Sequence, residues 1–477
     1  MMRTLSVLPL ALLTLVGCAV GPNYQRPPVS APAQFRGQVS PAQAASLADR
    51  AWWEIFSDAT LSSLIDEALR NSFDVQAAGW RVSEARAGAG IARSEFFPQV
   101  QLGGGWSRSR SPSFTGGSSA EPVSLYDVNL GLAWELDLWG RIRRLDEAAL
   151  ARYFASEEAR RGVMLSLIAE VATSYFELLR LDVQLGIAKR TAAAFGETRD
   201  LFDRRLAAGA ASALETASAE ASLASTSANI PDLERRIAAQ ENRLSLLLGR
   251  GPGDVPRGAT LNDQLLPPEI PPGLPSDLLE RRPDVREAEQ ALVAANANVG
   301  VATAELFPTI SLTGAFGGVA PQVSELLGKG KSWSVGGGLL APIFEGGRLA
   351  SARRAAVAQW QQARVAYEKA VTNALAEVST ALVGYEKLAE VEKQQARAVS
   401  ADREAVRLAN ERYVAGLADY LEVLQAEQQL YPAENALVQA RSDRLATLVQ
   451  LYKALGGGWK LSEQEWSGRT AATVGEP

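Results

Sequence analysis

Residues 126–138 read YDVNLGLAWELDL, and every second side chain in this run is apolar. The even positions hold Tyr126, Val128, Leu130, Leu132, Trp134, Leu136 and Leu138, and the odd positions hold polar or small residues. Strict alternation predicts a β-strand with one apolar and one polar face. Three further runs alternate similarly, at about residues 99–107, 309–316 and 333–343. The sequence therefore predicts four strands, each of a length typical of outer-membrane barrels.

The chain contains an internal repeat with a period of 207–210 residues. Ala92–Pro98 parallels Ala302–Pro308 at an offset of 210, and Gly140 parallels Gly347 at an offset of 207. An even offset keeps the parity of the alternation and an odd offset reverses it. Because the apolar parity also reverses only in the fourth run, we expect the same face of the sheet to be apolar in both copies.

Each copy also carries a long helical portion. Residues 141–208 and 348–415 lack proline and are rich in Ala, Leu, Glu and Arg. Each could form a helix of roughly 100 Å at about 1.5 Å per residue. Return helices are expected at about 210–249 and 417–455, the first with apolar residues seven apart at Leu223, Ile230, Ile237 and Leu244. Helices of this length favour antiparallel coiled coils over a compact domain.

The expected organisation follows the repeat. It comprises a signal peptide (1–17), a lipidated amino-terminal segment (18–60), a first repeat (61–249, with a strand pair at about 99–138 and a long helix pair at about 141–249), a Pro-rich equatorial linker (250–277), a second repeat (278–456, with a strand pair at about 309–344 and a long helix pair at about 348–455) and a carboxy-terminal tail (457–477).

The amino terminus predicts export and lipidation. Arg3 precedes the apolar run 5–16, which is too short to span a membrane as a helix and has the length of a signal-peptide core. Leu15-Val16-Gly17-Cys18 resembles the lipobox of bacterial lipoproteins, whose cysteine receives an S-diacylglycerol and an N-acyl chain such as palmitate. The alternative is a free cysteine after an ordinary signal peptide. Ala19 stands where aspartate often marks inner-membrane retention, so outer-membrane sorting is favoured.

Composition excludes several classes of function. The 477 residues hold 48 Lys+Arg and 54 Asp+Glu, for a net charge of −6, with one cysteine and no histidine. A mildly acidic chain without a basic block argues against nucleic acid as a partner. The missing histidines remove His-based metal sites and Ser-His-Asp catalysis. A phosphate-loop-like Gly328–Ser332 leaves an envelope hydrolase as a weak alternative, since Glu325 takes the first-glycine position. We expect no catalytic residue, no metal site and no cofactor beyond the lipid on Cys18.

Four strands cannot close a barrel, and an open sheet edge is not tolerated in lipid. Two chains would supply eight strands, whose interior is filled by side chains, and three would supply twelve, which leave room for a channel. At least a trimer is expected if something passes through. The alternatives are a soluble β-sandwich or a lipid-anchored coiled-coil scaffold without a pore. After Cys18 no run of about 18 apolar residues predicts a membrane-spanning helix.

These features together resemble a known family, the TolC-like outer-membrane factors of tripartite efflux pumps, in its lipoprotein (NodT-type) branch. The residues on which the resemblance rests are Cys18 followed by Gly21–Tyr24, the duplicated Phe-Pro turns, Asp137–Arg141, Arg412–Gly416 and Leu421–Leu424. The resemblance implies an α+β membrane protein that forms a homotrimer in the outer membrane of a Gram-negative bacterium. Its twelve-stranded β-barrel would be continued by a coiled-coil α-helical periplasmic tunnel.

The resemblance also implies the function and the partners. The chain would be a passive exit duct for drugs or other toxic small molecules, lipid-anchored in the outer membrane. A periplasmic adaptor and an inner-membrane transporter of the RND type would hand over the cargo. An exit duct for type I protein secretion and a metal-ion efflux duct are the alternatives that the sequence leaves open.

A periplasmic gate is the site that the resemblance implies. Its candidates are Arg412, Tyr413, Asp419, Leu421, Glu422 and Gln425, with helix-tip turns at Gly209, Glu215 and Gly416. Gln425 stands where relatives frequently carry a second acid. The alternatives are that Glu422 is a solvated helix-tip acid and that Leu421 is ordinary coiled-coil packing. Whether Glu422 or Asp419 faces the bore is left open by the sequence.

Overall fold

The computed structural model describes residues 19–29, 32–38, 46–49, 55–56, 58–110, 121–267, 270–273 and 275–457. Cys18, the expected signal peptide 1–17 and residues 458–477 of the expected tail lie outside the described residues. The chain divides into two compact units. The sheet unit comprises the described parts of residues 1–28, 81–157 and 287–368, and the helical unit comprises the described parts of residues 29–80, 158–286 and 369–477.

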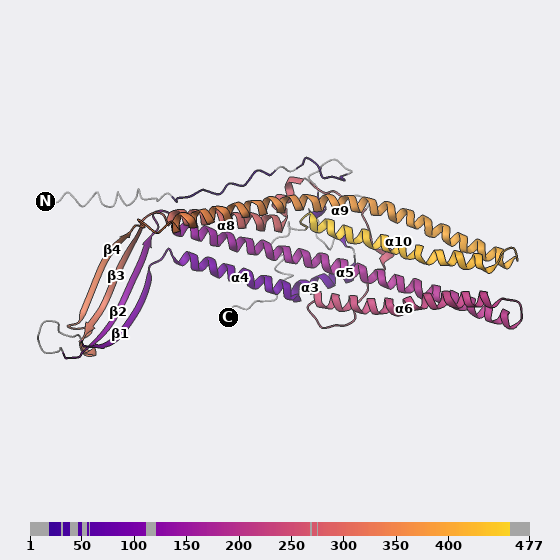
Figure 1. Cartoon of the computed structure of the whole chain (residues 1–477), viewed down its shortest axis with the longest axis horizontal. Helices are drawn as coiled ribbons and strands as arrows, with labels where there is room; N and C mark the ends of the chain where they lie inside the picture. Colours follow the sequence, from indigo (N-terminus) through magenta and orange to yellow (C-terminus); the bar gives the residue numbers. More distant parts are fainter. Residues whose placement is uncertain are drawn as a thin grey trace. The chain divides into compact units, whose positions relative to one another are not determined.

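Strands and long helices alternate along the described chain (Figure 1). The strands are β1 (Gln99–Ser109), β2 (Val123–Leu136), β3 (Thr309–Ala320) and β4 (Lys331–Leu340). The helices are α3 (Ala59–Asn71), α4 (Phe73–Ser94), α5 (Arg141–Ala207), α6 (Ala213–Leu247), α7 (Leu278–Arg281), α8 (Pro283–Ala304), α9 (Arg348–Val414) and α10 (Tyr420–Ala454). Short 3-10 turns are η1 (Leu47–Asp49), η2 (Leu261–Asp263), η3 (Pro275–Asp277) and η4 (Val323–Glu325). Four strands and long helices per chain confirm the expected fold class.

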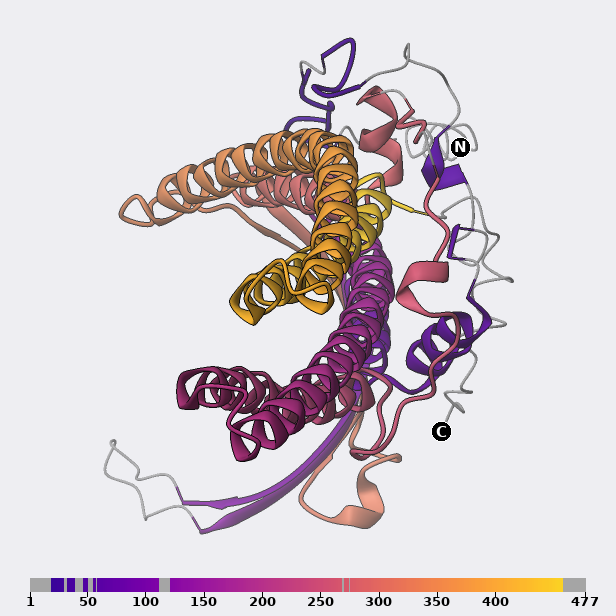
Figure 2. The same cartoon turned by 90° about the vertical axis from the view of Figure 1, so that its right-hand side faces the viewer.

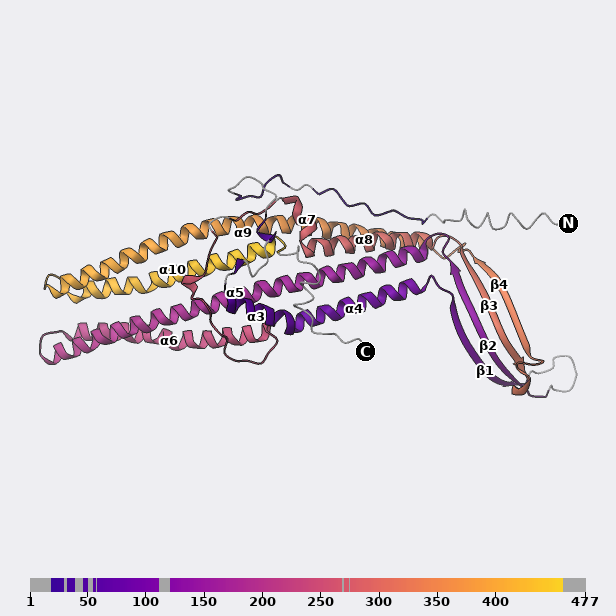
Figure 3. The ribbon, with the colours of Figure 1, turned by 180° about the vertical axis from the view of Figure 1, so that it is seen from behind.

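The four strands form one antiparallel sheet in the order β1-β2-β3-β4, which Figures 1 and 3 both show side by side. The register places apolar residues opposite one another: Leu130 pairs with Leu102 on one side and with Phe316 on the other, and Phe316 pairs with Trp333. Since facing residues in a sheet point to the same side, one face is apolar across all four strands, as expected. Leu102 is 76% exposed and Val335 is 80% exposed, so the described part of the chain leaves these side chains of the apolar face uncovered.

Tryptophans fasten the strand ends to the helices of the sheet unit. Trp134 Nε1 donates to the Phe96 carbonyl at 3.0 Å. Trp139 Nε1 donates to the Pro308 carbonyl at 2.7 Å, and its ring stacks on Phe307 at 4.8 Å. The two donors satisfy backbone carbonyls in the duplicated Phe-Pro turns, so these tryptophans hold the junction between strands and helices together.

The two copies of the repeat fold into helices of equal length. Helices α5 and α9 each contain 67 residues, and the return helices α6 and α10 each contain 35. Pro231 and Pro432 lie inside the return helices, which continue past them. One window of α5 is apolar enough to cross a membrane, but 67% of it is already buried within the chain. Packing therefore accounts for its apolar residues.

The Pro-rich linker is held to the helical unit by buried polar groups. The Tyr175 hydroxyl donates to Asp58 Oδ2 at 3.1 Å and accepts from the Gly258 backbone N–H at 2.8 Å. Asp58 also caps α3 by accepting from the N–H of Thr60 and of Leu61. Because a buried polar group without a partner is costly, this network fixes where the linker lies.

Candidate functional site

The gate candidates lie at the tips of two helix hairpins of the helical unit, α5–α6 and α9–α10, which end on the same side of it (Figures 2 and 3). Gly209 and Gly416 follow the long helices with φ of 73° and 70°. The N–H of Ala210 bonds to the Arg205 carbonyl, and that of Leu417 bonds to the Arg412 carbonyl, each at 2.8 Å. These are Schellman turns, in which glycine accepts the left-handed conformation at little cost.

The two tips differ in how they cap the return helix. In the first copy Ser212 and Glu215 form a capping box at the start of α6. The counterpart of Glu215, 207 residues later, is Glu422, but the side chain of Asp419 at the start of α10 makes no capping hydrogen bond. Glu422 instead pairs with Arg412, at 3.2 Å between Nε and Oε2, with both side chains about half exposed. The same acid thus stabilises a helix end in one copy and closes a hairpin in the other.

A second arginine links the two hairpins. Arg205, in the last turn of α5, donates a hydrogen bond to the Tyr413 hydroxyl, in the last turn of α9. The Arg205 guanidinium also lies over the Tyr413 ring, 5.3 Å from its centroid. Hydrogen bond and cation–π contact act on the same pair of residues. This is a direct tie between the first and the second copy of the repeat.

Beneath this tie lies an aromatic cluster. Tyr420 packs edge-on against Phe202, with ring centroids 4.6 Å apart, and edge-on against Tyr413, at 5.3 Å. Its hydroxyl donates to Thr198 Oγ1 at 2.8 Å. Burial raises the pKa of Tyr420 to about 12, so the hydroxyl stays protonated at any physiological pH. Burial likewise raises the pKa of the Glu427 carboxyl, which lies seven residues after Tyr420 on α10.

Phe202, Thr198 and Tyr420 were not among the predicted members of the site, because identities between the two copies do not reveal them. At the offset of 207, Phe202 corresponds to Ala409 and Tyr420 corresponds to Ala213. Phe202, Tyr420 and Ala409 share one buried cluster with Val423 and Leu424. A large residue in one copy therefore packs where the other copy has alanine. Size differences between the copies are the signal that could have found this contact.

The remaining gate candidates are exposed. Leu421 is 57% exposed, and it belongs to a set of exposed apolar residues at the tips, namely Leu206, Leu214, Val414 and Leu417. Asp419 and Gln425 are also exposed. Among the described residues, neither of these two side chains makes a hydrogen bond or ion pair with Arg412. The structure thus brings Arg412, Tyr413 and Glu422 into defined contacts and leaves Asp419, Leu421 and Gln425 open to solvent.

A second feature lies in the sheet unit, where residues 19–28 form an extended strap. The N–H of Val20 bonds to the Trp139 carbonyl at 2.9 Å, and the Pro22 carbonyl accepts from Asn296 Nδ2 at 2.9 Å. Arg26 pairs bidentately with Glu289 at 2.6 and 2.7 Å, and Tyr24 donates to the same carboxylate at 3.0 Å. Glu289 is largely buried, so three charge-assisted bonds fasten the strap to α8.

The strap ends at the junction between β2 and α5. Gly140 has a φ of 81°, and a Cβ there would lie 2.7 Å from the Cα of Ala19. Asp137 accepts hydrogen bonds from the N–H of Ile142 and of Arg143, both at 3.0 Å, which starts α5 directly after this glycine. The Asp137–Arg141 motif thus builds a turn against which the chain next to Cys18 packs. Cys18 itself lies outside the described residues.

Comparisons with known proteins agree with this arrangement. The family model "Outer membrane efflux protein" matches residues 64–250 and again residues 274–457. The toluene efflux pump outer membrane protein TtgC of Pseudomonas putida is 37% identical over 487 residues, covering 99% of each chain. The cation efflux system protein CusC of Escherichia coli is 35% identical, covering 94% of this chain and 97% of the relative. The probable outer membrane lipoprotein SilC of Salmonella typhimurium is 32% identical, with the same coverages.

Solved structures share the fold over nearly the whole chain. A membrane protein from Pseudomonas aeruginosa is similar with a TM-score of 0.84 at 36% identity, covering 93% of this chain and 98% of that one. The open state of the Neisseria gonorrhoeae MtrE outer membrane channel is similar with a TM-score of 0.83 at 34% identity, covering 92% and 98%. Four strands with one apolar face, joined to paired long helices, define the class of outer-membrane channels.

The chain belongs to the outer membrane efflux protein family. It is the outer-membrane channel of an efflux pump in a Gram-negative bacterium, and not an enzyme. The double match to one family model also confirms the internal repeat.

Proposed function

We propose that three copies of this chain form a passive exit duct, with a twelve-stranded barrel in the outer membrane and a helical tunnel in the periplasm. The observation that carries the proposal is the open sheet. In the described chain β1 and β4 each pair with one strand only, and an apolar face runs across all four strands.

Three is the smallest number of copies that satisfies both the sheet edges and the need for a passage. Unpaired backbone groups at the edges of β1 and β4 are costly in lipid, so β1 of one copy must pair with β4 of the next. Three copies give twelve strands, and a barrel of twelve leaves space that eight would fill with side chains. The face opposite the apolar one is polar and small, with residues such as Gln101, Asn129, Gly131 and Ser334 in neighbouring registers. Such a face suits a water-filled bore.

Drugs or other toxic small molecules are the proposed cargo, delivered by an RND-type inner-membrane transporter through a periplasmic adaptor. Support comes from the relatives, one of which is named for toluene efflux. Another is named for cation efflux, so a metal-ion duct is the second candidate. Type I protein secretion finds no support among these names. The exposed apolar tips, with Leu214 75% and Val414 84% exposed, offer the adaptor a surface to cover.

Reconstitution tests the duct. We expect the purified, lipidated protein to have the mass of three chains plus detergent by light scattering, and to conduct ions in a planar bilayer. In a strain that lacks its own outer-membrane channel, the protein together with its adaptor and transporter should restore resistance to toluene-like solvents. Resistance to metal cations alone would instead support the metal-ion duct. A monomer that conducts nothing would overturn the proposal.

The hairpin tips are the proposed gate. Each of the three copies would hold its entrance narrow through two ties, Arg412–Glu422 within one hairpin and Arg205–Tyr413 between hairpins. Both ties are exposed, so each contributes only about 0.2–1 kcal/mol and a docking partner can break them. Leu421 would add an apolar constriction, because its side chain is 57% exposed at the tip.

The Arg412–Glu422 pair also bears on ion preference. A ring of three Glu422 carboxylates would favour cations in the entrance. While Arg412 holds Glu422, its positive charge largely neutralises that carboxylate. We therefore assign the cation preference to the open state, in which the pair is separated. Asp419 is a second exposed acid near the entrance, and Gln425 contributes no charge.

For the membrane anchor, we propose Cys18 as the lipidated residue, with S-diacylglycerol and N-acyl chains. The lipobox and the lipoprotein relative support it. The strap adds a physical reason, since Ala19 packs against Gly140 where the strands meet the helices. A lipid on the preceding residue would thus start close to the end of the sheet where β2 meets α5. Two or more acyl chains give the stable anchoring that one chain does not.

Cys18→Ser should abolish incorporation of radiolabelled palmitate, because the chain has no other cysteine. Labelling of the protein immunoprecipitated from cells measures this. Glu289→Gln is the matched control, since it weakens the strap without touching the lipobox and should keep full labelling. Palmitate that persists on the Cys18→Ser chain would refute the assignment.

A further inference from the structure

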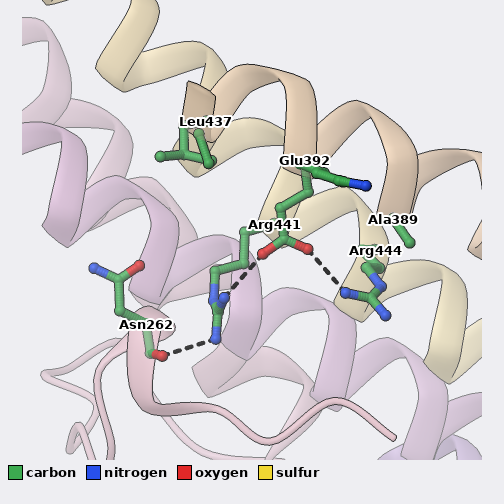
Figure 4. A pocket seen from close by; sticks show the side chains of 8 residues that line it. Asn262, Ala389, Glu392, Leu437, Arg441 and Arg444 are labelled. Carbon is green, nitrogen blue, oxygen red and sulfur yellow. Dashed lines mark hydrogen bonds and ion pairs between the residues drawn. The ribbon is translucent and has the colours of Figure 1, made fainter. Parts of the chain in front are cut away.

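A pocket lies within the helical unit, between α9, α10 and the Pro-rich linker, and has a volume of about 340 Å³ (Figure 4). Its charged lining residues are Glu392 and Lys393 on α9 with Arg441 and Arg444 on α10, and Asn262 closes it from the linker. Three cations and one carboxylate leave the lining with a net charge of +2. This excess stands out in a chain whose total charge is −6.

The arginines already hold one carboxylate in a defined geometry. Glu392 accepts from Arg441 Nη1 at 2.9 Å and from Arg444 Nη1 at 3.0 Å, and Figure 4 shows it between the two guanidinium groups. The rest of Arg441 is committed to the linker, since it donates to the carbonyls of Leu261, Asn262 and Gln264 at 3.0, 2.7 and 3.2 Å. Arg441 is therefore a fixed wall of the pocket.

Arg444 and Lys393 keep donors to spare. Arg444 lies over the Tyr385 ring at 4.8 Å, which holds the plane of its guanidinium. Its Nη2 has only a 3.5 Å contact with the Tyr385 hydroxyl, which is at the outer limit of a hydrogen bond. Lys393 is exposed and, among the described residues, has no salt bridge or hydrogen bond. The planar edge of a guanidinium together with an exposed ammonium suits an oxyanion.

We propose that this pocket binds a small anion carrying two or more carboxylate or phosphate groups, with one group on Arg444 and another on Lys393. A multivalent ligand is required because a single negative charge leaves the lining positive. A small ligand is required because the linker at Asn262 limits the space. Binding would fasten the linker, because Arg444, which would bind the anion, shares Glu392 with Arg441, which holds the linker carbonyls.

Isothermal titration of the purified, lipidated full-length protein with citrate and with pyrophosphate tests the site. Acetate at matched ionic strength controls for general screening. Lys393→Gln should weaken binding of both anions by about three- to tenfold, because it removes one exposed charge-assisted contact. Lys387→Gln is the matched control, since Lys387 lies on the same helix, is 70% exposed and pairs with Glu386 outside the pocket.

Glu392→Gln provides a change of opposite sign. Removing the competing carboxylate should tighten citrate binding, and circular dichroism verifies that the helices are intact. A second readout is the linker, whose cleavage by protease should slow when citrate is present.

The proposal is overturned if neither anion binds at about 10 mM, if acetate binds equally well, or if Lys387→Gln weakens binding as much as Lys393→Gln. Pyrophosphate binding without citrate binding would restrict the site to phosphates.

Discussion

Leu130→Arg should prevent the protein from assembling in the outer membrane. Leu130 lies in the middle of β2, is 46% exposed in the single chain, and pairs with Leu102 and Phe316 on the apolar face. Arginine near the middle of a lipid-facing strand costs about 2–4 kcal/mol per chain. Every copy in the oligomer bears this cost. We expect the amount of oligomer in isolated outer membranes to fall at least tenfold, measured by its unheated band on a denaturing gel.

Asn129→Arg is the matched control for this experiment. Asn129 is the adjacent residue of β2 and lies on the opposite face, where Gly103 and Gly317 are its cross-strand partners. The same charge at the same depth, but toward a water-filled bore, should leave assembly largely intact. If both variants lose the oligomer equally, the two faces do not differ as lipid and water, and the barrel proposal fails.

Removing both ties at the hairpin tips should open the duct. The variant Arg205→Ala, Arg412→Ala, Glu422→Ala deletes the link between hairpins and the link within one. Each tie contributes at most about 1 kcal/mol, but three copies hold six ties, so the closed state loses a few kcal/mol. Since 1.4 kcal/mol is a factor of about ten, we expect mean conductance in planar bilayers to rise at least tenfold.

A salt bridge away from the tips controls for a general loss of charge. Arg235 and Asp232 on α6 form an exposed pair at 2.7 Å in the same unit, and their double alanine variant should conduct like the wild type. The single variants show which of the two ties contributes more to closing the duct. Arg205→Ala should open the duct more than Glu422→Ala, because Arg205 joins one hairpin to the other while Glu422 pairs with an arginine of its own hairpin. A triple variant that keeps the wild-type closed current would show that these contacts do not gate.

Much of the fold was predictable because its signals are local. The alternation in residues 126–138 predicted β2, and the proline-free run 141–208 predicted α5, which ends at Ala207. The parity of the repeat predicted a common apolar face, and the pairing of Leu130 with Phe316 confirms it. Periods of two and 3.6 residues follow from the backbone alone, so one sequence suffices to read them.

The candidate site was predictable only in part. Resemblance to the family led to Arg412 and Glu422, which do contact each other, but it gave no reason to pair Arg205 with Tyr413. These two residues are 208 positions apart. A comparison of identical residues in the two copies also overlooks Tyr420, because its counterpart is Ala213.

The sequence by itself determined that the chain has four strands with one apolar face and paired long helices, because each of these depends on side chains a few residues apart. It also determined the duplicated plan, because the two copies can be compared residue by residue at an offset of 207–210. Only the tertiary structure decided that Glu215 caps a helix while its counterpart Glu422 binds an arginine. It also decided that Glu392 gathers Arg441 and Arg444 beside the linker. A charge has no preferred partner until folding brings one within a few ångströms, and that distance is set by packing across the whole unit.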